Sequence, residues 1–544
     1  MQSNNYWSST EYAGDPDNAW NVNMNNGNVN NNNKSNNNYV WAVRGDNDAL
    51  PLFSFKNIFQ QYLACRRNKR SAINPLAFEI HCEENLLELK QALDLRTYRP
   101  SRSVCFMATR PKLREIFAAD FHDRIVHHIL VDYLEKIWEP KFIHDSYACR
   151  RGKGIHAGIK RLQSFIGKAA CNGSRRAWFL QLDIANFFMS INKDILYGLI
   201  ADKVRDEQVL WLARTIISHD CTKDFVLKGD RDYLKKIAPQ KSLFYTAEGK
   251  GLPIGNLTSQ FFANPYLNEL DQFVKHSLKC RHYLRYCDDF VLVSEDRDRL
   301  LAWKDEIGDF LRDKLRLSLN HKRQSFQPVS NGIDFLGYIV RHDYILVRKR
   351  VANNLRSKLD LFEKRLIKKE QPPYVRVVYD YPALEKLRAT LASYLGHFKW
   401  ADSYRLQAGL LERYGFLKRF FSLQIGRRIQ ALYKVPAKIP SLRLQERYFR
   451  TRFPADVLLF QVGGYYEFFR GDDKDAGMLG LNKVTCQCGR KVQYGFPVRM
   501  EKPFVKKIMD AGKTVTVVNE SDRYLTRIKE RLPRYSLAVA GVSN

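Results

Sequence analysis

The chain has 544 residues, with 89 lysine and arginine residues against 58 aspartate and glutamate residues, a formal net charge of +31 and 13% aromatic residues. A chain of this length exceeds what one hydrophobic core supports, so we expect three or more structural units. The basic excess, interleaved with aromatic residues, is typical of a nucleic-acid-binding protein. Without an apolar run of membrane-spanning length or a signal peptide, the sequence predicts a cytoplasmic protein with no membrane contact.

The first 45 residues are rich in asparagine, which occupies 15 of the first 40 positions. Such a segment has few aliphatic side chains to bury, so we expect it to be disordered or loosely attached. Two aromatic stretches, residues 6–12 and 39–44, stand apart from this composition. We call residues 1–45 the leader.

From about residue 50 to 165 the sequence predicts a mostly helical region with basic turns. Several basic side chains of this region can neutralise phosphate groups. They are Lys112, Arg114, Arg150, Arg151 and Lys153. A basic solvated surface explains the last three nearly as well, so both interpretations stay open for them.

Two stretches about a hundred residues apart combine apolar runs with acidic residues. Residues 178–188 form an apolar run interrupted by Asp183, and a carboxylate inside a buried strand is costly unless it is paired or binds a metal ion. Residues 284–293 place Asp288 and Asp289 between two apolar stretches, which predicts a β-hairpin with both carboxylates at its tip.

Together, these three carboxylates indicate a metal site. An isolated Asp-Asp pair is more often a solvated turn, but adjacent anions repel each other unless a cation or solvent relieves them. Mg²⁺ prefers carboxylate oxygen, water and phosphate, and two Mg²⁺ ions about 4 Å apart stabilise the entering and leaving oxygens of phosphoryl transfer. We therefore expect Asp183 and Asp288 to hold two Mg²⁺ ions, with Asp289 in support.

Between the acidic stretches, the polar and basic residues 219–250 have the character of an insertion. They are followed by residues 251–260, where Pro253 and Gly255 predict a turn and Asn256 can cap the next helix.

Beyond the hairpin, leucine and phenylalanine recur at helical spacing from about residue 350 to 440, which predicts a helical region. The last hundred residues predict a small α/β domain. Its elements are a strand and a glycine turn within residues 453–469, a helix around 504–509 and a strand over 513–518.

Read together, the acidic stretches resemble reverse transcriptases, whose palm carries an Asp-Ile-x-x-Phe-Phe strand and a Tyr-x-Asp-Asp hairpin, here residues 183–188 and 286–289. Further matching blocks follow in the family's order. They are residues 110–116, 121–126, 145–154, 319–322 and 334–338. The resemblance implies an α+β right-hand polymerase with a small α/β domain after it. Its parts would be fingers over residues 46–165, a palm with an antiparallel sheet over 166–345 and a helical thumb over 346–440.

The same resemblance implies an RNA-directed DNA polymerase, a nucleotidyltransferase whose partners are template RNA, dNTPs, cDNA and the RNA/DNA heteroduplex. Asp183 and Asp288 would bind the metals with the backbone carbonyl of Ile184, and the ring of Phe188 would exclude a ribose 2′ hydroxyl. Other nucleotide-binding candidates are Lys112, Arg114, Ile254, Gln260 and Lys322. Template-binding candidates are Arg150, Arg151 and Lys153.

Residues 251–260 distinguish lineages within this family. Group II intron and retron-like enzymes commonly carry Gln-Gly-x-x-x-Ser-Pro, whereas Ile254-Gly-x-x-x-Ser-Gln260 is similar to the enzymes of diversity-generating retroelements. Residues 6–12 and 39–44 of the leader resemble the end of the C-type-lectin-like variable domain that such elements diversify. Asn codons begin with two adenines, the template base that these enzymes copy unfaithfully. We infer that the leader is the element's template repeat translated in frame; an asparagine-rich tail without coding significance is the alternative.

This narrower resemblance implies synthesis of adenine-mutagenised cDNA from template-repeat RNA, which diversifies a target gene with the help of a small basic accessory protein. Two alternatives remain open. One is a group II intron or retron-type reverse transcriptase without programmed error. The other is a nucleic-acid-binding scaffold that recognises mismatches.

The C-terminal domain, over residues 450–535, resembles the mismatch-recognition domain of MutS. In that domain a Phe-x-Glu element wedges a ring beside a mispaired base, and the corresponding residues here are Tyr465 and Glu467. A tyrosine ring can still stack on a base. Equally, the aromatic residues around Tyr465 can belong to the core and rim of a small α/β domain.

Overall fold

The structure is a computed structural model that describes most of the chain. The described residues are 5–11, 18–23, 29–33, 51–67, 73–109, 112–426, 428–436, 439, 441–469, 471–483, 494–525 and 527–539. Residues 39–44 and Arg110, which carried expectations above, lie outside these segments. None of the helices in the described segments is long and apolar enough to cross a membrane.

The described residues divide into two compact units. The first unit comprises Met1–Lys136, Ala201–Arg231 and Gly255–Thr258; the second comprises Ile137–Ile200, Asp232–Ile254 and Ser259–Asn544.

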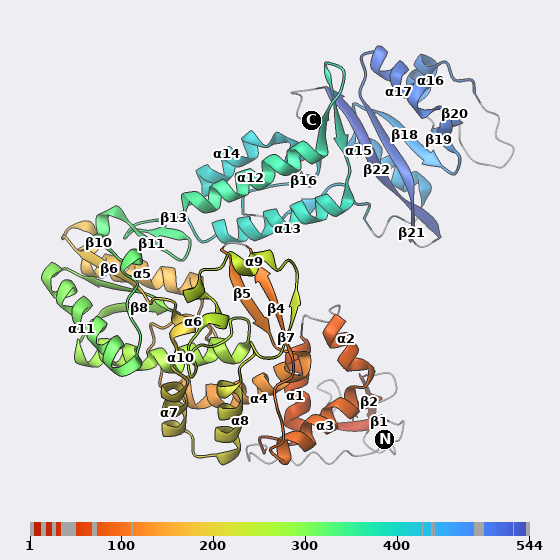
Figure 1. The fold of residues 1–544 in the computed structure, drawn as a ribbon. Coiled ribbons are helices and arrows are strands. Elements are labelled where there is room, and N and C mark those ends of the chain that lie inside the picture. The colour runs from red at the N-terminus through yellow and green to blue at the C-terminus, as the bar shows by residue number, and fades with distance from the viewer. Residues whose placement is uncertain are drawn as a thin grey trace. The chain divides into compact units, whose positions relative to one another are not determined.

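The first unit combines helices with a three-stranded sheet (Figure 1). Its helices are α1 (Phe55–Arg66), α2 (Ile73–Ile80), α3 (Cys82–Asp94), α8 (Glu207–Ser218) and most of α4 (Phe121–Trp138). In the sheet, β4 (Ser103–Ala108) pairs antiparallel with β5 (Arg114–Ala118) and parallel with β7 (Phe225–Lys228). β7 comes from residues 219–250, so the segment expected to be an insertion supplies a strand to this sheet.

In the leader, three short strands form an antiparallel sheet in the order β1-β2-β3. They are β1 (Asn5–Glu11), β2 (Asn18–Asn23) and β3 (Val29–Asn33). These strands differ from disorder, which was one of the two expectations for the leader; its loose attachment stays a prediction. Backbone N–H and C=O groups can form a ladder whatever the side chains, and a few strand-forming residues such as Trp20 and Val22 occur within it.

The second unit is built on a four-stranded antiparallel sheet with the order β10-β6-β9-β8, which we call the central sheet. Its strands are β6 (Trp178–Asp183), β8 (His282–Tyr286), β9 (Asp289–Ser294) and β10 (Ser325–Pro328). β8 and β9 form the predicted hairpin. β6 pairs with β9 along its whole length, from Trp178 opposite Ser294 to Asp183 opposite Asp289.

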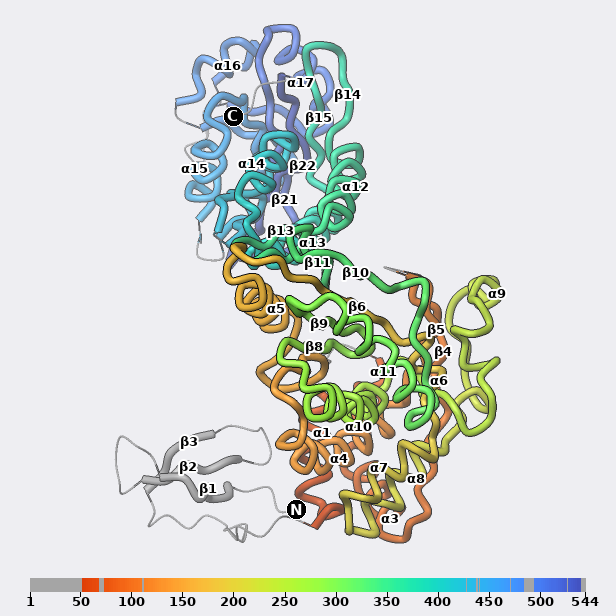
Figure 2. Tube along the Cα trace, turned by 90° about the vertical axis from the view of Figure 1, so that its left-hand side faces the viewer, coloured from red at the N-terminus to blue at the C-terminus, as the bar shows by residue number. Residues whose placement is uncertain are grey.

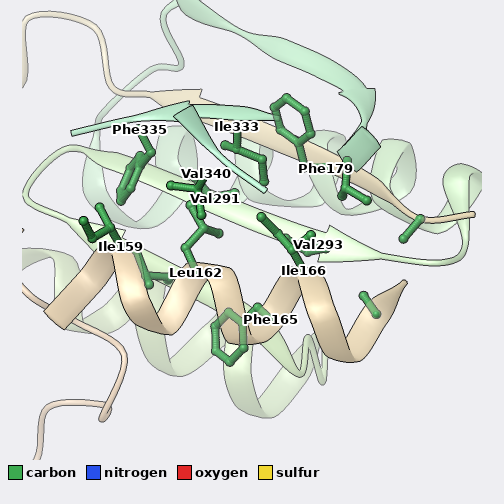
Figure 3. Close-up of a cluster of buried hydrophobic side chains, with 14 of the residues drawn as sticks. Ile159, Leu162, Phe165, Ile166, Phe179, Val291, Val293, Ile333, Phe335 and Val340 are labelled. Atoms are coloured by element: carbon green, nitrogen blue, oxygen red, sulfur yellow. The ribbon is translucent and has the colours of Figure 1, made fainter. Parts of the chain in front are cut away.

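Helices cover both faces of the central sheet. The helices that precede or connect its strands in the sequence are α5 (Ile155–Ala169), α6 (Phe187–Ser190), α7 (Lys193–Lys203), α9 (Asp232–Lys235), α10 (Leu257–Gln272) and α11 (Arg297–Leu315). On one face, Leu162 of α5 belongs to the same buried cluster as Phe179 and Val291 of the sheet (Figure 3). Side chains alternate along a strand, so the buried Leu180 and Leu292 point to the other face, which α11 contacts.

A small three-stranded sheet and a helical region follow. The sheet contains β11 (Ile333–Phe335), β12 (Tyr338–Val340) and β13 (Ile345–Val347). The helices are α12 (Lys349–Leu366), α13 (Tyr381–Phe398) and α14 (Tyr404–Arg413), with a short ladder between β16 (Phe421–Ser422) and β17 (Gln430–Ala431). Leu355 and Leu359 of α12 and Leu384 and Leu387 of α13 share one core, as their helical spacing predicts.

The region between α12 and α13 was expected to be helical but contains a hairpin, β14 (Ile367–Lys369) and β15 (Tyr374–Val378). This hairpin joins the C-terminal strands in one seven-stranded sheet with the order β14-β15-β22-β21-β18-β19-β20 (Figures 1 and 2). β15 pairs antiparallel with β22, from Tyr374 opposite Val539 to Val378 opposite Tyr535. The Tyr374 hydroxyl donates a hydrogen bond to the Met509 carbonyl at 3.0 Å. The thumb expected over residues 346–440 and the C-terminal domain expected over 450–535 thus share a sheet.

Both faces of this sheet are buried. The C-terminal elements are α15 (Leu442–Arg452), β18 (Val457–Val462), β19 (Tyr465–Phe468), α16 (Asp473–Leu479), β20 (Tyr494–Pro497), α17 (Glu501–Asp510), β21 (Val515–Leu525) and β22 (Ile528–Val539). Along β18, Leu459 faces the cluster that contains Ile508 of α17, whereas Leu458 faces the cluster that contains Phe449 of α15. The alternation of apolar residues on β18 therefore fixes which helix lies on which face.

Candidate active site

The central sheet brings together the acids that the sequence singled out. Asp183 is the last residue of β6 and lies opposite Asp289, the first residue of β9. Asp288 lies in the turn between β8 and β9, and its backbone carbonyl accepts a hydrogen bond from the Ile184 N–H at 3.2 Å. Two strands of one sheet thus place the three carboxylates at one end of β6 and β9, as predicted.

Asp183 is held by residues that follow α11. The Asn320 side chain donates from Nδ2 to Asp183 Oδ2 at 2.8 Å, and the Asn320 backbone N–H donates to the Asp183 carbonyl at 2.8 Å. Arg323 Nη1 lies 3.6 Å from the same carboxylate oxygen. Neither residue was predicted as a site residue, although Asn320 belongs to the block at 319–322 that carried the family resemblance.

Asp289 shows that the site concentrates negative charge. Burial raises the pKa of Asp289 to about 6, and the neighbouring Asp183 and Asp288 carboxylates act in the same direction. A hydrogen bond from Gln181 Nε2 at 3.2 Å acts against this shift by stabilising the ionised form. A cation bound between the three carboxylates would reduce the electrostatic repulsion among them.

The donor set fits Mg²⁺, which commonly takes only one or two protein carboxylates and fills its other positions with water and substrate phosphate. Asp183 and Asp288 can supply these carboxylates. Within the described segments, no group of three or more His, Cys, Asp or Glu side chains is already arranged around a metal position.

A buried ion pair lies beneath the hairpin that carries two of the acids. Arg285 of β8 donates from Nε and Nη2 to Asp271 of α10 at 2.8 and 2.6 Å, and neither side chain is exposed. Arg285 Nη1 donates to the Cys287 carbonyl in the turn at 3.0 Å, and the Tyr283 hydroxyl donates to Asp271 at 2.7 Å. These bonds anchor the turn, in which Cys287 has a positive φ of 57°.

Phe188, the expected gate against ribonucleotides, lies in α6, and the segment that carries Ile254 runs past it. The Leu252 N–H donates to the Phe188 carbonyl at 2.8 Å, so the backbones of these two segments are in contact. Phe187 is 2% exposed and belongs to the core, whereas the next ring, Phe188, is only partly buried. Phe188 is therefore not part of the closed core, and its role as a gate stays a prediction.

The turn before α10 explains two residues of the 251–260 block. Asn256 precedes the first residue of α10, and its side-chain oxygen accepts a hydrogen bond from the Ala119 N–H at 3.0 Å. Gly255 has a φ of 129°, and a Cβ there would lie 2.8 Å from the Phe117 carbonyl oxygen, so only glycine fits. Ile254 is partly buried, while Gln260 is exposed with its amide oxygen 3.9 Å from Cys149 Sγ.

The basic candidates differ in their surroundings. Lys112 and Arg114 are exposed residues of the first unit, so their predicted contact with the triphosphate stays a prediction. Lys322 is exposed beside Asn320, whose side-chain oxygen accepts its backbone N–H at 3.2 Å.

Arg150 has an internal role that the sequence did not reveal. Its side chain is 5% exposed, pairs with Glu139 at 2.7 Å and donates to the carbonyls of Ile143 and Ser146. Lys153 donates to the His144 carbonyl at 3.0 Å, and Arg151 is exposed. The guanidinium of Arg150 is thus already bound within the protein, and the predicted template contact of Arg151 stays a prediction.

Tyr465 and Glu467 lie on β19, next to the glycine turn that follows β18. Tyr466 and Phe468, which alternate with them, are buried in the core of the sheet. The Tyr466 hydroxyl donates to Glu501 at 2.5 Å. Tyr465 is 54% exposed. Tyr466 and Phe468 thus belong to the core, as one of the two interpretations has it, and contact of Tyr465 with a mispaired base stays a prediction.

Comparison with known families agrees with this arrangement. Residues 108–340 match the family of reverse transcriptases (RNA-dependent DNA polymerases), which normally use Mg²⁺. Residues 444–535 match MutS domain I, which confirms the resemblance predicted for the C-terminal domain. Residues 1–44 match the Lcl C-terminal domain. The segment 108–340 is therefore a reverse transcriptase domain, an RNA-directed DNA polymerase.

Individual relatives are distant. The chain is 23% identical to protein YkfC of Escherichia coli over 310 residues, which is 49% of this chain and 74% of that protein. It is 24% identical to the group II intron-encoded protein LtrA of Lactococcus lactis over 324 residues, which is 48% of this chain and 50% of LtrA. This chain thus spans about half the length of LtrA. Among solved structures, apo telomerase from Candida tropicalis matches with a TM-score of 0.35 at 12% identity over 59% of this chain and 60% of that chain; this likeness is too low to support an argument.

Proposed function

We propose that this chain, whose residues 108–340 are a reverse transcriptase domain, copies a template-repeat RNA into cDNA with errors opposite adenine and so diversifies a target gene. The observation that carries the polymerase function is the register of the central sheet, which places Asp183 opposite Asp289 with Asp288 in the adjoining turn. The same geometry supports a proposed chemical role for each acid.

In the proposed reaction, the primer 3′ hydroxyl attacks the α-phosphate of a dNTP and pyrophosphate leaves. When bound, two Mg²⁺ ions would supply charge stabilisation at the entering and leaving oxygens. Asp183 and Asp288 would hold them together with the Ile184 carbonyl. Asp289 would support the site, since its carboxylate receives the Gln181 hydrogen bond and the residue lies directly opposite Asp183 in the sheet.

Two observations support the error-prone assignment over other reverse transcriptases. Ile254 and Gln260 replace the glutamine and proline that intron and retron-like enzymes commonly carry at these places. The leader matches a protein-domain family, which supports its origin as a translated copy of another coding sequence. Gln260 is exposed and stands at the start of α10, where it could contact the template strand.

A second candidate function is that of a group II intron reverse transcriptase without programmed error, and the likeness to LtrA favours it. A low error rate spread evenly over the template bases would decide for this candidate. A third candidate, a scaffold that only binds mismatched nucleic acid, is favoured by the match to MutS domain I. It would be supported if cDNA synthesis survived the loss of Asp288.

We further propose that the C-terminal domain holds the mispaired duplex that forms when mutagenised cDNA meets its target gene. Tyr465 would stack beside the mispair, which costs less to open than a matched pair. By resemblance, a small basic accessory protein and the element's own RNA would act with the chain.

The deciding experiment is to sequence the cDNA that the purified chain makes with Mg²⁺ from an RNA that encodes residues 1–45. The Asp288→Ala variant tests the site, and Asp305→Ala, on the exposed surface of α11, is a matched control for loss of a carboxylate. Errors concentrated opposite adenine, with no cDNA from Asp288→Ala and normal synthesis by Asp305→Ala, are the expected result. Faithful cDNA would overturn the error-prone assignment, and cDNA from Asp288→Ala would overturn the site.

A further inference from the structure

A pocket of about 550 Å³ lies in the second unit, at the end of the central sheet away from the acids. Three segments form its walls: the approach to β6, the end of β10 and the turn between β12 and β13. β6 separates the pocket from the active site, because Trp178 at its start lines the pocket and Asp183 ends the strand. Five residues of extended chain put about 17 Å between these two ends. We call this cavity the basic pocket.

The basic pocket carries positive charge that the protein cancels only in part. Three arginines line it, Arg175, Arg176 and Arg341, against one acid, Asp343. Arg341 donates to the carbonyls of Ser330 and Asn331, which fix its position without neutralising its charge. Arg175 is paired with Glu295. Arg176 is exposed and makes no hydrogen bond or ion pair to any other residue of the described segments.

Aromatic rings line the pocket beside these charges. The Arg341 guanidinium lies 5.6 Å from the centre of the Tyr344 ring, and the partly buried Trp178 forms part of another wall. The His342 ring lies against Gly173, where a Cβ would be 3.0 Å from His342 Nε2 and where φ is 94°. The absence of a side chain at Gly173 therefore allows the His342 imidazole to pack against the backbone and line the pocket. Rings beside arginine groups are the surroundings in which unpaired bases stack and phosphates bind.

We propose that the basic pocket binds a single-stranded RNA segment outside the part being copied. A phosphate would lie at Arg176 and Arg341, and a base would stack on His342 or Tyr344. The volume is in the range of about 300–1,000 Å³ that ligands of nucleotide size occupy. RNA is favoured over a duplex because a pocket of this size admits a splayed base but no base pair. The inference rests on the proposed polymerase function, which gives the protein an RNA partner.

The first test compares the Arg176→Glu/His342→Ala variant with wild type and with Arg443→Glu, an equal charge reversal at an exposed position of α15. Binding of a 20-nucleotide single-stranded RNA is measured at two salt concentrations. We expect the pocket variant to bind about tenfold more weakly and its salt dependence to fall by about one counterion. Extension of a short primer on a template that ends at the active site should not change. Equal affinities for the pocket variant, wild type and Arg443→Glu would overturn the proposal.

The second test does not depend on activity. Ultraviolet crosslinking of the same RNA to wild-type protein should label the tryptic peptide of residues 342–348, which contains His342 and Tyr344. Adenosine monophosphate or single-stranded DNA that competes as well as the RNA would overturn the assignment to an RNA strand, as would absence of this crosslink. If the wild-type chain makes no cDNA yet gives the crosslink, the proposed function fails while the pocket assignment stands.

Discussion

Arg285 and Asp271 form an ion pair of 2.6 Å in which neither side chain has any exposed surface. A buried pair of this kind costs desolvation energy that its own attraction only partly offsets. Arg285 also donates to the Cys287 carbonyl, so the pair is joined to the turn that carries Asp288. We interpret the pair as a device that positions the metal-binding acids, and this interpretation predicts separate effects on stability and on turnover.

Arg285→Met should destabilise the protein by about 3–5 kcal/mol, because it leaves the Asp271 carboxylate buried without its partner. The double variant Arg285→Met/Asp271→Leu should recover most of this loss, yet its kcat should stay low because the Cys287 carbonyl has lost its donor. Thermal unfolding and single-turnover primer extension measure the two effects, with Arg281→Met at an exposed position as the control. Wild-type kcat in the double variant would show that the pair serves packing alone.

Adjacent phenylalanines should respond differently to the same substitution. Phe188→Val should raise incorporation of ribonucleotides relative to deoxyribonucleotides by about ten- to a hundredfold, since a smaller side chain leaves room for a 2′ hydroxyl. Phe187→Val should instead lower stability by about 2 kcal/mol, because Phe187 is 2% exposed and its loss leaves a cavity. Primer extension with each nucleotide set, beside thermal unfolding, separates the two. An unchanged nucleotide preference in Phe188→Val would remove Phe188 from the gate position.

Gln260→Ala should reduce errors opposite template adenine severalfold while leaving total cDNA within about twofold of wild type. Gln260 is exposed at the start of α10, so its removal should alter contacts with nucleic acid more than folding. The readout is the error spectrum of sequenced cDNA. Gln327→Ala, on the exposed side of β10, is the control, and an identical spectrum in all three proteins would exclude Gln260 as a fidelity residue.

Tyr465→Ala should weaken binding to a duplex with one mismatch about five- to twentyfold and leave binding to the matched duplex nearly unchanged, since stacking on a base contributes about 1–3 kcal/mol. Tyr524→Ala is a suitable control because Tyr524 is similarly exposed, at 61%, on β21 of the same sheet. Binding isotherms for both duplexes supply the comparison. An equal loss for matched and mismatched duplexes in Tyr465→Ala would contradict mismatch recognition.

His127 makes the first unit sensitive to acid. Burial lowers the pKa of His127 to about 4, below its unfolded value near 6.5, although Asp123 acts in the opposite direction. The unfolded chain therefore binds the proton more readily, and stability should be complete above about pH 6.5 and fall by about 3 kcal/mol as the pH drops to 4. His127→Gln should flatten this slope in denaturant unfolding between pH 7.5 and 4.5. The control, His276→Gln at an exposed position, should retain the wild-type slope.

The parts of the fold and of the site that could be predicted are those with a recognisable pattern within a short stretch of sequence. Asp183 stood out because it interrupts an apolar run, and Asp288 because it lies between two apolar stretches. The leucine spacing of α12 and α13 showed which faces are buried. Asn320 and Arg323 were missed as partners of Asp183 because their contacts join positions far apart in the chain, and neither residue type is unusual in a turn. The hairpin β14–β15 was missed because its strands are short. Their alternation of apolar and polar residues is therefore a weaker signal than the helical spacing of apolar residues in α12 and α13. Arg150 was expected at the surface because the sequence around it gives no sign that its guanidinium is buried in an ion pair with Glu139.

The pairing of β15 with β22 also determines when the chain can finish folding. Tyr374 can pair with Val539 only after Val539 has been synthesised. During translation, β15 therefore stays unpaired on this side until β22, the last described strand, has been made. Contacts so distant in sequence slow folding, and an unpaired β15 is an open edge that can recruit another chain. A protein shortened near residue 450 would lack β22, so this edge of β15 would stay unpaired permanently. Aggregation of such a shortened protein would reflect the missing strand rather than any role of the C-terminal domain in nucleic-acid binding, which makes single substitutions on β19 the cleaner probe.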